Sequence, residues 1–239
     1  MEVINYLLGY KDLKIVQNTK MFCFSLDSVL LPNFVTLNAR TKQILDIGCG
    51  NAPMPLILST KTKAHITGVE IQKEVYDMAK KTVYINNKED QIDIIFGDIE
   101  VVYKNWESDS FDVIVCNPPF FKINEGSRFN ESNNKTLARH ELTLDLEKIM
   151  LISKKLLKNN GVIGIVHRPE RLISIIEIMK KNRIEPKKVQ FIYPKMDSEA
   201  NILLIEGKKN GRPGLKVLPS IYSHNENGDY SKQIEKFFE

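Results

Sequence analysis

The sequence contains no run of about 18 apolar residues, which is the length that a membrane-spanning helix requires. Its first stretch, MEVINYLLGYKDLK, has an acid at position 2 and only a very short apolar segment, so it does not have the pattern of a signal peptide. We therefore expect a cytoplasmic protein without a membrane span.

Cysteine is scarce as well. The chain has three, Cys23, Cys49 and Cys116, which lie far apart and lack the spacing of metal ligands. Separated cysteines in an odd number are typical of reduced thiols in a cytoplasmic protein. The sequence therefore predicts no metal site.

Repeats and linkers are missing too. No stretch is rich enough in Pro, Gly or Ser to divide the 239 residues, and 42% of them are hydrophobic. A chain of this length and composition can build one sizeable core. We expect a single domain over 1–239, with a core at 41–207 and a tail at 208–239.

Short apolar runs alternate with amphipathic segments along most of the chain. Predicted strands lie within 43–52, 65–70, 92–98, 111–116, 161–167, 187–193 and 200–207, and predicted helices within 52–60, 71–87, 144–159 and 169–182. Gly161 is expected to close the helix at 144–159. Alternating units of this kind predict an α/β fold, with seven strands, mostly parallel, helices on both faces and an antiparallel ribbon at the end.

A glycine turn follows the first predicted strand. The stretch DIGCGNA (46–52) has the Gly-x-Gly spacing that lets a ligand approach the backbone. Glu70 ends the next strand, twenty residues after Gly50, where its carboxylate is placed to accept the ribose hydroxyls of an adenosine ligand. Because glycines also end strands for steric reasons, the interpretation of this turn as a ligand-binding site depends on Glu70.

Asp98 ends the third strand, where its carboxylate is placed to meet the exocyclic amine of an adenine. The carboxyl ends of parallel strands meet at one edge of a sheet, so these three strand ends favour a nucleoside ligand there. The alternative is that the acids cap the helices that follow them, which suits Asp98 better than Glu70.

The third glycine of a pyrophosphate-binding turn is absent. Asn51, Ala52 and Pro53 follow Gly50, and a ligand without phosphate tolerates this looser turn. Together with GVE, FGD and NPPF, in this order, the turn resembles the S-adenosylmethionine-dependent methyltransferases with a Rossmann-like, seven-stranded sheet. The resemblance implies cofactor contacts from Asp27, Asp46, Gly48, Cys49, Gly50, Glu70, Ile71, Asp98, Ile99 and Asn117.

The fourth strand runs directly into Asn117, Pro118, Pro119 and Phe120. Proline has no backbone N–H to donate to a neighbouring strand, so the two prolines end the strand and form a stiff corner. The Asn117 side-chain oxygen and the Pro118 carbonyl are placed to accept both hydrogens of a planar amine, which localises its lone pair, and Phe120 can stack on the base. The corner resembles the Asn/Asp-Pro-Pro-Tyr/Phe motif of amino-methyltransferases; the alternative is a plain turn after a strand.

Three longer stretches of the sequence indicate a more specific family among the methyltransferases. MFCFSLDSVLLPNF (21–34), LARHELTL (137–144) and the segment 201–234 are similar to the bacterial tRNA1(Val) adenine-37 N6-methyltransferases. The resemblance implies transfer to adenine N6 next to the anticodon of a tRNA. It also implies that residues 1–40 form a hairpin and a helix that cover the cofactor site, with Asp27 and Ser28 expected to cap that helix.

Positive charge is concentrated late in the chain. Between Lys154 and Lys216 there are fifteen Lys or Arg and six Asp or Glu, an excess of +9, and the remainder has nineteen against twenty-four, or −5. This asymmetry suggests a polyanionic partner, although a solvated lysine-rich surface is equally consistent with it. The residues predicted to contact RNA are Arg139, His140, Lys187, Lys188, Lys208, Lys209 and Arg212.

Two other enzymes share the corner. A guanine-N2 methyltransferase of ribosomal RNA would have histidine after the motif, where this chain has Phe121. A protein-glutamine methyltransferase would need an N-terminal substrate domain, and few residues precede Gln43. A non-enzymatic RNA-binding module is a third reading, which the intact cofactor motifs oppose. The sequence leaves the oligomeric state and the conformation of 122–136 open.

Overall fold

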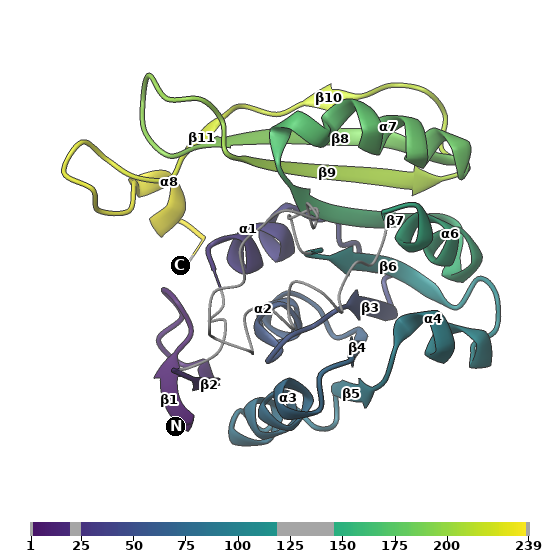
Figure 1. Ribbon diagram of the computed structural model, residues 1–239, viewed down its shortest axis with the longest axis horizontal. Helices are drawn as coiled ribbons and strands as arrows, with labels where there is room; N and C mark the ends of the chain where they lie inside the picture. The colour runs from purple at the N-terminus through teal and green to yellow at the C-terminus, as the bar shows by residue number, and fades with distance from the viewer. Residues whose placement is uncertain (1, 20–24, 119–145, 238–239) are drawn as a thin grey trace, which may run out of the picture.

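The computed structural model describes residues 2–19, 25–118 and 146–237. Its main element is a nine-stranded sheet in the order β10–β8–β9–β7–β6–β3–β4–β5, with β11 paired to β8 (Figure 1). The strands of this sheet are β3 (Gln43–Ile47), β4 (His65–Glu70), β5 (Ile92–Phe96), β6 (Phe111–Cys116), β7 (Leu157–His167), β8 (Ile184–Tyr193), β9 (Ile202–Lys209), β10 (Lys216–Val217) and β11 (Ile221–Tyr222).

The predicted fold class is confirmed. Strands β3 to β9 are the seven predicted strands, and β9 is antiparallel to both β7 and β8, as expected for the terminal ribbon. Strands β10 and β11 were not predicted. Each has only two residues, which is too short for an alternating apolar pattern to be recognised.

The direction of the strands gives the sheet two functionally different edges. Strands β3 to β7 are parallel, so all five end at one edge, which we name the carboxyl edge; the opposite edge is the amino edge. Strand β9 runs the other way, and its Lys208 lies opposite Val162 of β7, which in turn pairs with Val113 near the start of β6. The end of β9 therefore lies at the amino edge.

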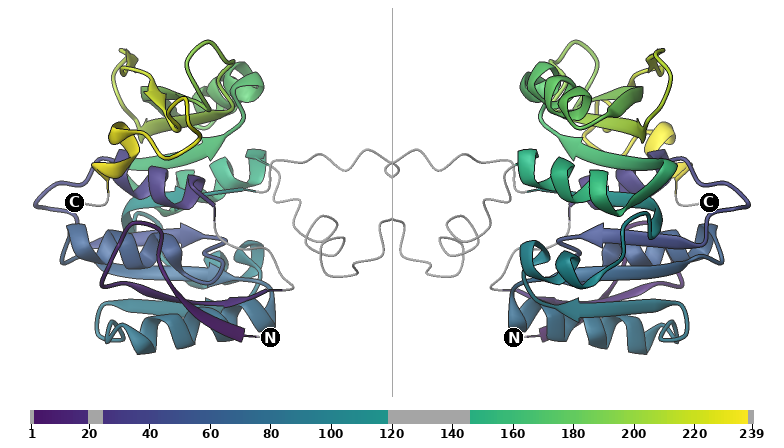
Figure 2. Two further views of the ribbon diagram at one scale, coloured as in Figure 1. Left: turned by 90° about the vertical axis from the view of Figure 1, so that its left-hand side faces the viewer. Right: turned by 90° about the vertical axis from the view of Figure 1, so that its right-hand side faces the viewer.

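Helices cover both faces of the sheet (Figure 2). One core packs α1 (Asp27–Phe34), α2 (Pro53–Lys61) and α3 (Lys73–Ile85) against one face, and the other packs α4 (Ile99–Val102), α6 (Leu146–Leu156) and α7 (Leu172–Lys181) against the opposite face. Ile44 and Leu45, neighbours on β3, belong to different cores because side chains alternate along a strand. The near-continuous apolar runs in the sequence have this origin.

The end of α6 differs from the prediction. The helix ends at Leu156 rather than near Gly161, which lies inside β7. The pairing of β6 with β7 shifts register here, and a Cβ on Gly161 would lie 2.9 Å from the Lys158 carbonyl oxygen and 3.0 Å from that of Asp112. Glycine is therefore required by the close backbone approach of a β-bulge, and not by a helix terminus.

The N-terminal segment forms a hairpin of β1 (Glu2–Tyr6) and β2 (Lys14–Asn18), which packs on α3. The Val16 N–H donates to Thr82 Oγ1 at 3.0 Å. Helix α1 begins at Asp27, and its N-cap residue is Leu26. The prediction that Asp27 and Ser28 cap this helix was wrong, because both lie in its first turn.

The C-terminal tail runs alongside β8, from the amino edge to the carboxyl edge. It leaves β9 at the amino edge, and β10 pairs with the middle of β8, where Val217 lies opposite Val189. Strand β11 then pairs with the end of β8, and α8 (Lys232–Glu235) follows. Ile234 is fully buried in the core that contains α1, so the tail returns to the carboxyl edge and is fixed there.

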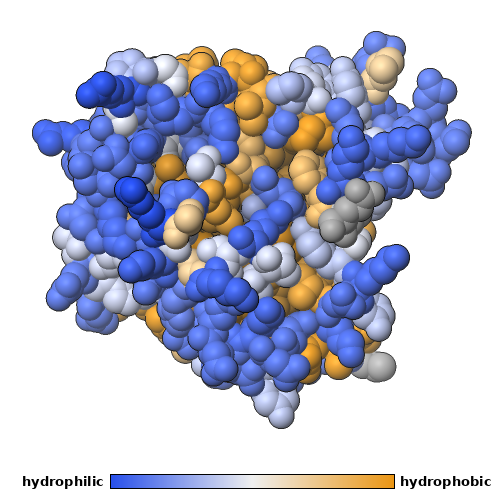
Figure 3. All heavy atoms as spheres, turned by 180° about the vertical axis from the view of Figure 1, so that it is seen from behind, coloured by the Kyte–Doolittle hydropathy of each residue, from blue (hydrophilic) through white to orange (hydrophobic). Residues whose placement is uncertain are grey.

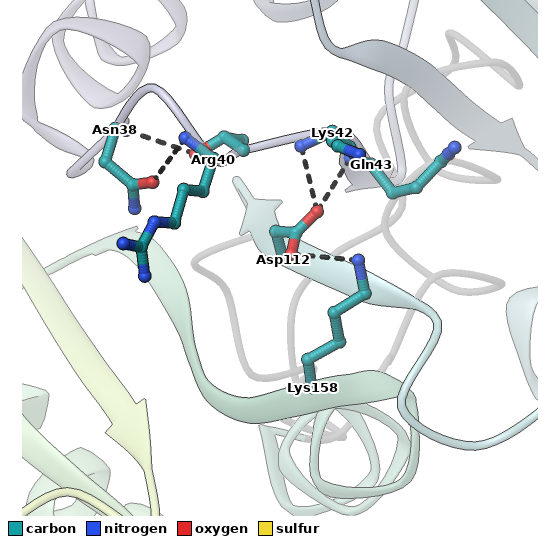
Figure 4. A network of polar contacts seen from close by, with 7 residues as sticks. Asn38, Arg40, Lys42, Gln43, Asp112 and Lys158 are labelled. Carbon is teal, nitrogen blue, oxygen red and sulfur yellow. Dashed lines mark hydrogen bonds and ion pairs between the residues drawn. The ribbon is translucent and has the colours of Figure 1, made fainter.

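Asp112 joins three strands at the amino edge (Figure 4). Its Oδ2 accepts from the N–H groups of Lys42 and Gln43, both at 2.9 Å, and its Oδ1 accepts from Lys158 Nζ at 2.9 Å. Burial alone would raise the pKa of Asp112, but these hydrogen bonds outweigh it and hold the pKa below its ordinary value. The amino edge is thus fixed by structural contacts.

Seen from behind the view of Figure 1, the surface is mostly hydrophilic, with apolar side chains reaching it in places (Figure 3). Leu215 and Val217 of the tail are among the exposed apolar residues of the molecule. In the described part of the chain, every helix is too short or too polar to traverse a lipid bilayer.

Candidate active site

The predicted ligand-binding residues gather at the carboxyl edge. In the paired strands, Ile47 lies opposite both Val69 of β4 and Cys116 of β6, and Glu70 lies opposite Phe96 of β5. The residues that follow these strand ends are therefore neighbours in space. They include Gly48, Ile71, Asp98 and Asn117.

The glycine turn leaves its backbone open. Gly48 and Gly50 have φ of 72° and 57°, and a Cβ built on either would meet nothing within 4 Å. The N–H groups of Gly48 and Cys49 both donate to the Val69 carbonyl at 3.0 Å, which fixes the turn to β4. Ala52, two residues after Gly50, also has a left-handed φ of 72°. The backbone thus keeps the conformation that a glycine would favour.

Glu70 connects the turn to the start of α3. Its Oε2 accepts from the Gly50 N–H at 3.0 Å, and its Oε1 accepts from the Gln72 N–H at 2.8 Å. Burial raises the pKa of Glu70, against the opposing effect of these N–H donors and that of Ile71. Each carboxylate oxygen retains a second lone pair, so the predicted role toward ribose hydroxyls is compatible with these bonds.

Asp46 is a buried carboxylate with no hydrogen-bond partner among the described residues. It is 0% exposed, and neither of its oxygens accepts a hydrogen bond. Burial raises its pKa well above the ordinary value, and the charge of Glu70 adds to this effect. The charge of Asp46 also acts on the buried thiols of Cys49 and Cys116. Burial raises the pKa of each thiol well above its ordinary value, and Asp46 raises it further.

Asp98 caps a helix, which was the alternative reading of this residue. Its Oδ1 accepts from the Glu100 N–H at 2.8 Å, and Asp98 is the N-cap of α4. Ile99 follows it and is buried. The cap uses one carboxylate oxygen, so a contact from Asp98 to an adenine amine stays a prediction.

The corner at 117–120, predicted to accept hydrogen bonds from an amine, is described as far as Pro118. Asn117 is half-buried and Pro118 is buried, directly after β6. Continuing the pairing of Ile47 with Cys116 by one residue sets Asn117 beside Gly48, in the first position of the glycine turn. Pro119, Phe120, Arg139, His140 and the stretch 122–136 lie outside the described residues.

Asp27 lies at the same edge, in the first turn of α1. Its Oδ2 accepts from Ser25 Oγ at 3.1 Å. Burial raises its pKa, while the Ser25 hydroxyl and the charge of Arg168 oppose that rise. The N-terminal segment therefore reaches the end of β7 as well as the glycine turn, where Asn51 Nδ2 donates to the Val16 carbonyl at 2.7 Å.

The predicted basic residues on the terminal ribbon are not brought to this edge. Lys208, Lys209 and Arg212 lie at or beyond the amino-edge end of β9. Lys209 is largely buried, pairs with Asp109 at 2.7 Å and donates to the Leu157 carbonyl.

The two lysines of β8 also have internal partners. Lys188 pairs with Glu206 at 3.2 Å and donates to the carbonyl of Phe34 at 2.6 Å. Lys187 donates to the Arg212 carbonyl. The ammonium groups of Lys188 and Lys209 are thus committed to structural contacts.

Sequence reasoning missed the basic residues that do lie at the carboxyl edge. Arg168 and Arg171 follow β7 directly, in the stretch HRPER (167–171). The available signal was their position after a predicted parallel strand. No group of three or more His, Cys, Asp or Glu side chains that could hold a metal ion occurs within the described ranges.

A mostly parallel sheet of this order, with a glycine turn at its carboxyl edge, defines a Rossmann-like methyltransferase fold. A solved structure, described as a predicted O-methyltransferase, protein Atu636 from Agrobacterium tumefaciens, matches with a TM-score of 0.70 and 17% identity, covering 89% of this chain and 95% of that one. The model of the methyltransferase small domain matches residues 13–182. The chain belongs to this methyltransferase family.

Curated relatives carry a more specific name. A tRNA1(Val) (adenine(37)-N6)-methyltransferase of Aliivibrio fischeri is 26% identical over 224 residues, covering 90% of this chain and 89% of the relative. One of Porphyromonas gingivalis is 31% identical over 174 residues, covering 70% and 66%. The similarity to these tRNA-modifying enzymes thus extends over most of the chain.

Proposed function

We propose that this chain transfers a methyl group from S-adenosylmethionine to N6 of an adenine in tRNA, at position 37 beside the anticodon of tRNA1(Val), as its relatives are named to do. The observation that carries the proposal is the pairing of Ile47 with Cys116, which brings β3 and β6 to an end side by side, just before Gly48 and Asn117. The residues that would hold the amine and those that would bind the nucleoside therefore follow neighbouring strand ends. The enzyme would act in the cytoplasm, where its tRNA substrate is found.

The residues of the glycine turn fit this cofactor. Asp46 is buried without a partner in the described part of the chain, and such a carboxylate favours a cationic group nearby. Glu70 would accept from the ribose hydroxyls, Ile71 and Ile99 would contact the adenine ring, and Asp98 would accept from the adenine amine. When bound, the cofactor would supply an electrophilic methyl group on a sulfonium.

The chain's own residues prepare the amine. An aromatic NH2 is a weak nucleophile because its lone pair is delocalised into the ring. The Asn117 side-chain oxygen and the Pro118 carbonyl would accept its two hydrogens, which favours tetrahedral nitrogen and localises the lone pair. The nitrogen held by these residues would form its bond to the methyl carbon as the sulfur–carbon bond of the cofactor breaks, and it would then give up one proton to solvent. Orientation supplies most of the acceleration, so no strong base is required.

The test is a methylation assay with the purified protein. Labelled S-adenosylmethionine is incubated with transcripts of tRNA1(Val), of the same tRNA with guanine at position 37, and of an unrelated tRNA, and the product nucleosides are separated. We expect label in N6-methyladenosine from the first transcript only. Label in guanosine, or in a release factor offered in the same assay, would replace the adenine assignment by one of the two rival enzymes.

A further inference from the structure

The register of the sheet separates the predicted RNA-binding lysines from the site. Lys208 lies opposite Val162, Val162 opposite Val113, and Val113 opposite Ile44. Lys208 is therefore level with a residue four positions before Gly48, roughly 13 Å away along the strand direction at about 3.3 Å per residue. An adenine held at Asn117 needs its neighbouring phosphates bound at the carboxyl edge instead.

Two arginines occupy that edge on the side of the acceptor corner. Cys116 lies opposite Ile165, so continuing the register sets Pro118 beside His167, on strands about 4.8 Å apart. Arg168 and Arg171 follow His167 immediately, in the short helix η2 (Pro169–Arg171) and just before it. Among the described residues, they are the first arginines or lysines beyond the corner on the β7 side.

Arg168 is held in place by its neighbours. Its N–H donates to His167 Nδ1 at 2.8 Å, and its Nη1 donates to the Asn201 carbonyl at 2.8 Å. It also lies close enough to Asp27 to oppose the rise that burial causes in the pKa of that carboxyl. A guanidinium has five N–H donors in a planar fork, so an anchored arginine can still present a paired set of donors to a phosphate.

Arg171 lies near His167, as Arg168 does. Burial lowers the pKa of His167 to about 4, and the charge of Arg171 is the next largest cause, which places the guanidinium near the imidazole. The Arg171 Nε is buried and has no hydrogen-bond partner within the described residues. Among the described residues, the acids near these arginines are Asp27, which is predicted to contact the cofactor, and Glu170, which is exposed.

We propose that Arg168 and Arg171 bind backbone phosphates of the substrate RNA next to the target nucleotide. The inference rests on the proposed function, since it needs an RNA as the substrate. The arginines would fix the register of the anticodon loop on the enzyme, while Asn117 and Pro118 hold the base. The lysines at the amino edge would have no part in this contact.

The test compares two variants that each remove two positive charges, Arg168→Gln/Arg171→Gln at the carboxyl edge and Lys208→Gln/Arg212→Gln at the amino edge. Affinity for the tRNA1(Val) transcript is measured over a range of salt concentrations, together with kcat and KM for methylation. We expect the first variant to bind about tenfold more weakly and to lose roughly one unit of salt slope for each phosphate contact. The second should behave as the wild type.

The reverse result, or an equal loss in both variants, would overturn the inference. Binding of S-adenosylhomocysteine by calorimetry checks that each variant is folded. If the double variant fails this check, the single variant Arg171→Gln is used, with Arg171→Lys as the charge-retaining control. A salt slope in Arg171→Gln as steep as that in Arg171→Lys and in the wild type would equally overturn the inference. A wild type that methylates no tRNA contradicts the proposed function, whereas an active wild type with a normal arginine variant contradicts only the arginine contact.

Discussion

Asp46 is a buried carboxylate without a partner among the described residues, and such a group costs a folded protein free energy, so its presence at the glycine turn is informative. Its pKa is raised in the folded state, so the folded protein holds the proton more tightly than the unfolded chain does. Stability from this group is fully present below the ordinary pKa of an aspartate and is lost as the pH rises above it.

We expect Asp46→Asn to raise the melting temperature of the ligand-free protein at neutral pH, by roughly 2–4 °C for each kcal/mol gained. The gain should shrink as the pH falls toward 4, because wild-type Asp46 is then neutral as well. The same variant should bind S-adenosylmethionine more weakly, about tenfold or more, because a charge-assisted contact is lost. Thermal scans at several pH values and calorimetry measure both effects. A lower melting temperature with unchanged cofactor affinity would show that Asp46 is structural.

Asn117 is tested by removing its acceptor oxygen. In Asn117→Ala the amine loses one of its two acceptors, and we expect kcat to fall by about 10²–10³-fold, as for the loss of one preorganised polar group. The affinity for S-adenosylmethionine should change little, since the glycine turn and Glu70 are intact. Asn117→Asp retains an oxygen at this position and serves as the control, with activity well above that of the alanine variant. Normal turnover in Asn117→Ala would remove the acceptor role.

At the level of elements, a buried ion pair attaches the N-terminal segment to the sheet. Glu206 of β9 is 5% exposed and pairs with Lys188 of β8 at 3.2 Å. The same carboxylate accepts from the Thr36 N–H at 2.6 Å and from Thr36 Oγ1 at 2.9 Å, just after α1. Because α1 begins with Asp27 at the carboxyl edge, this pair helps to hold a predicted cofactor residue in place.

A double-mutant cycle measures this attachment. Glu206→Gln leaves the Lys188 ammonium buried without its counter-charge, and we expect a loss of roughly 3–5 kcal/mol in the free energy of unfolding. Lys188→Met should also destabilise the protein, but the double variant should lose less than the sum of the two, because neither charge then stays uncompensated. Denaturant titrations give the four free energies. Additive losses would show that the two side chains act independently.

The predicted strands show how far periodicity reaches. β4 and β6 have the predicted bounds because each is a mostly apolar run that ends at or just before a polar residue, Glu70 and Asn117 respectively. The end of α6 and the two strands of the tail were missed because long-range contacts decide them: Gly161 is required by a neighbouring strand, and β10 and β11 exist only through pairing with β8. Local sequence does not contain that information.

At the scale of the whole molecule, the sequence predicts that the proposed cofactor residues share one edge of the sheet, but it does not predict where the lysines of the ribbon lie. Gly48, Glu70, Asp98 and Asn117 each lie at or just after the end of a strand, and parallel strands must end at one edge. The lysines of the ribbon were grouped by closeness in sequence. Strand β9 is antiparallel, and this reversal carries Lys208 and Lys209 to the opposite edge. A count of charges cannot reveal such a reversal.

This division into two edges predicts the pattern of hydrogen exchange when ligands bind. Adding S-adenosylhomocysteine should slow exchange of backbone amides in 46–52, 68–73 and 96–100, which form the carboxyl edge around the cofactor site. Adding tRNA should extend the protection to 167–172, beyond the end of β7. The segments 38–43, 108–112 and 208–212 belong to the amino edge and should exchange as in the free protein, because Asp112 and Lys209 already fix them through internal contacts. Exchange followed by mass spectrometry gives these rates for each segment.

Protection of 208–212 by tRNA would place the RNA across the amino edge, and the adenine could then reach Asn117 only if the RNA spanned the sheet from one edge to the other.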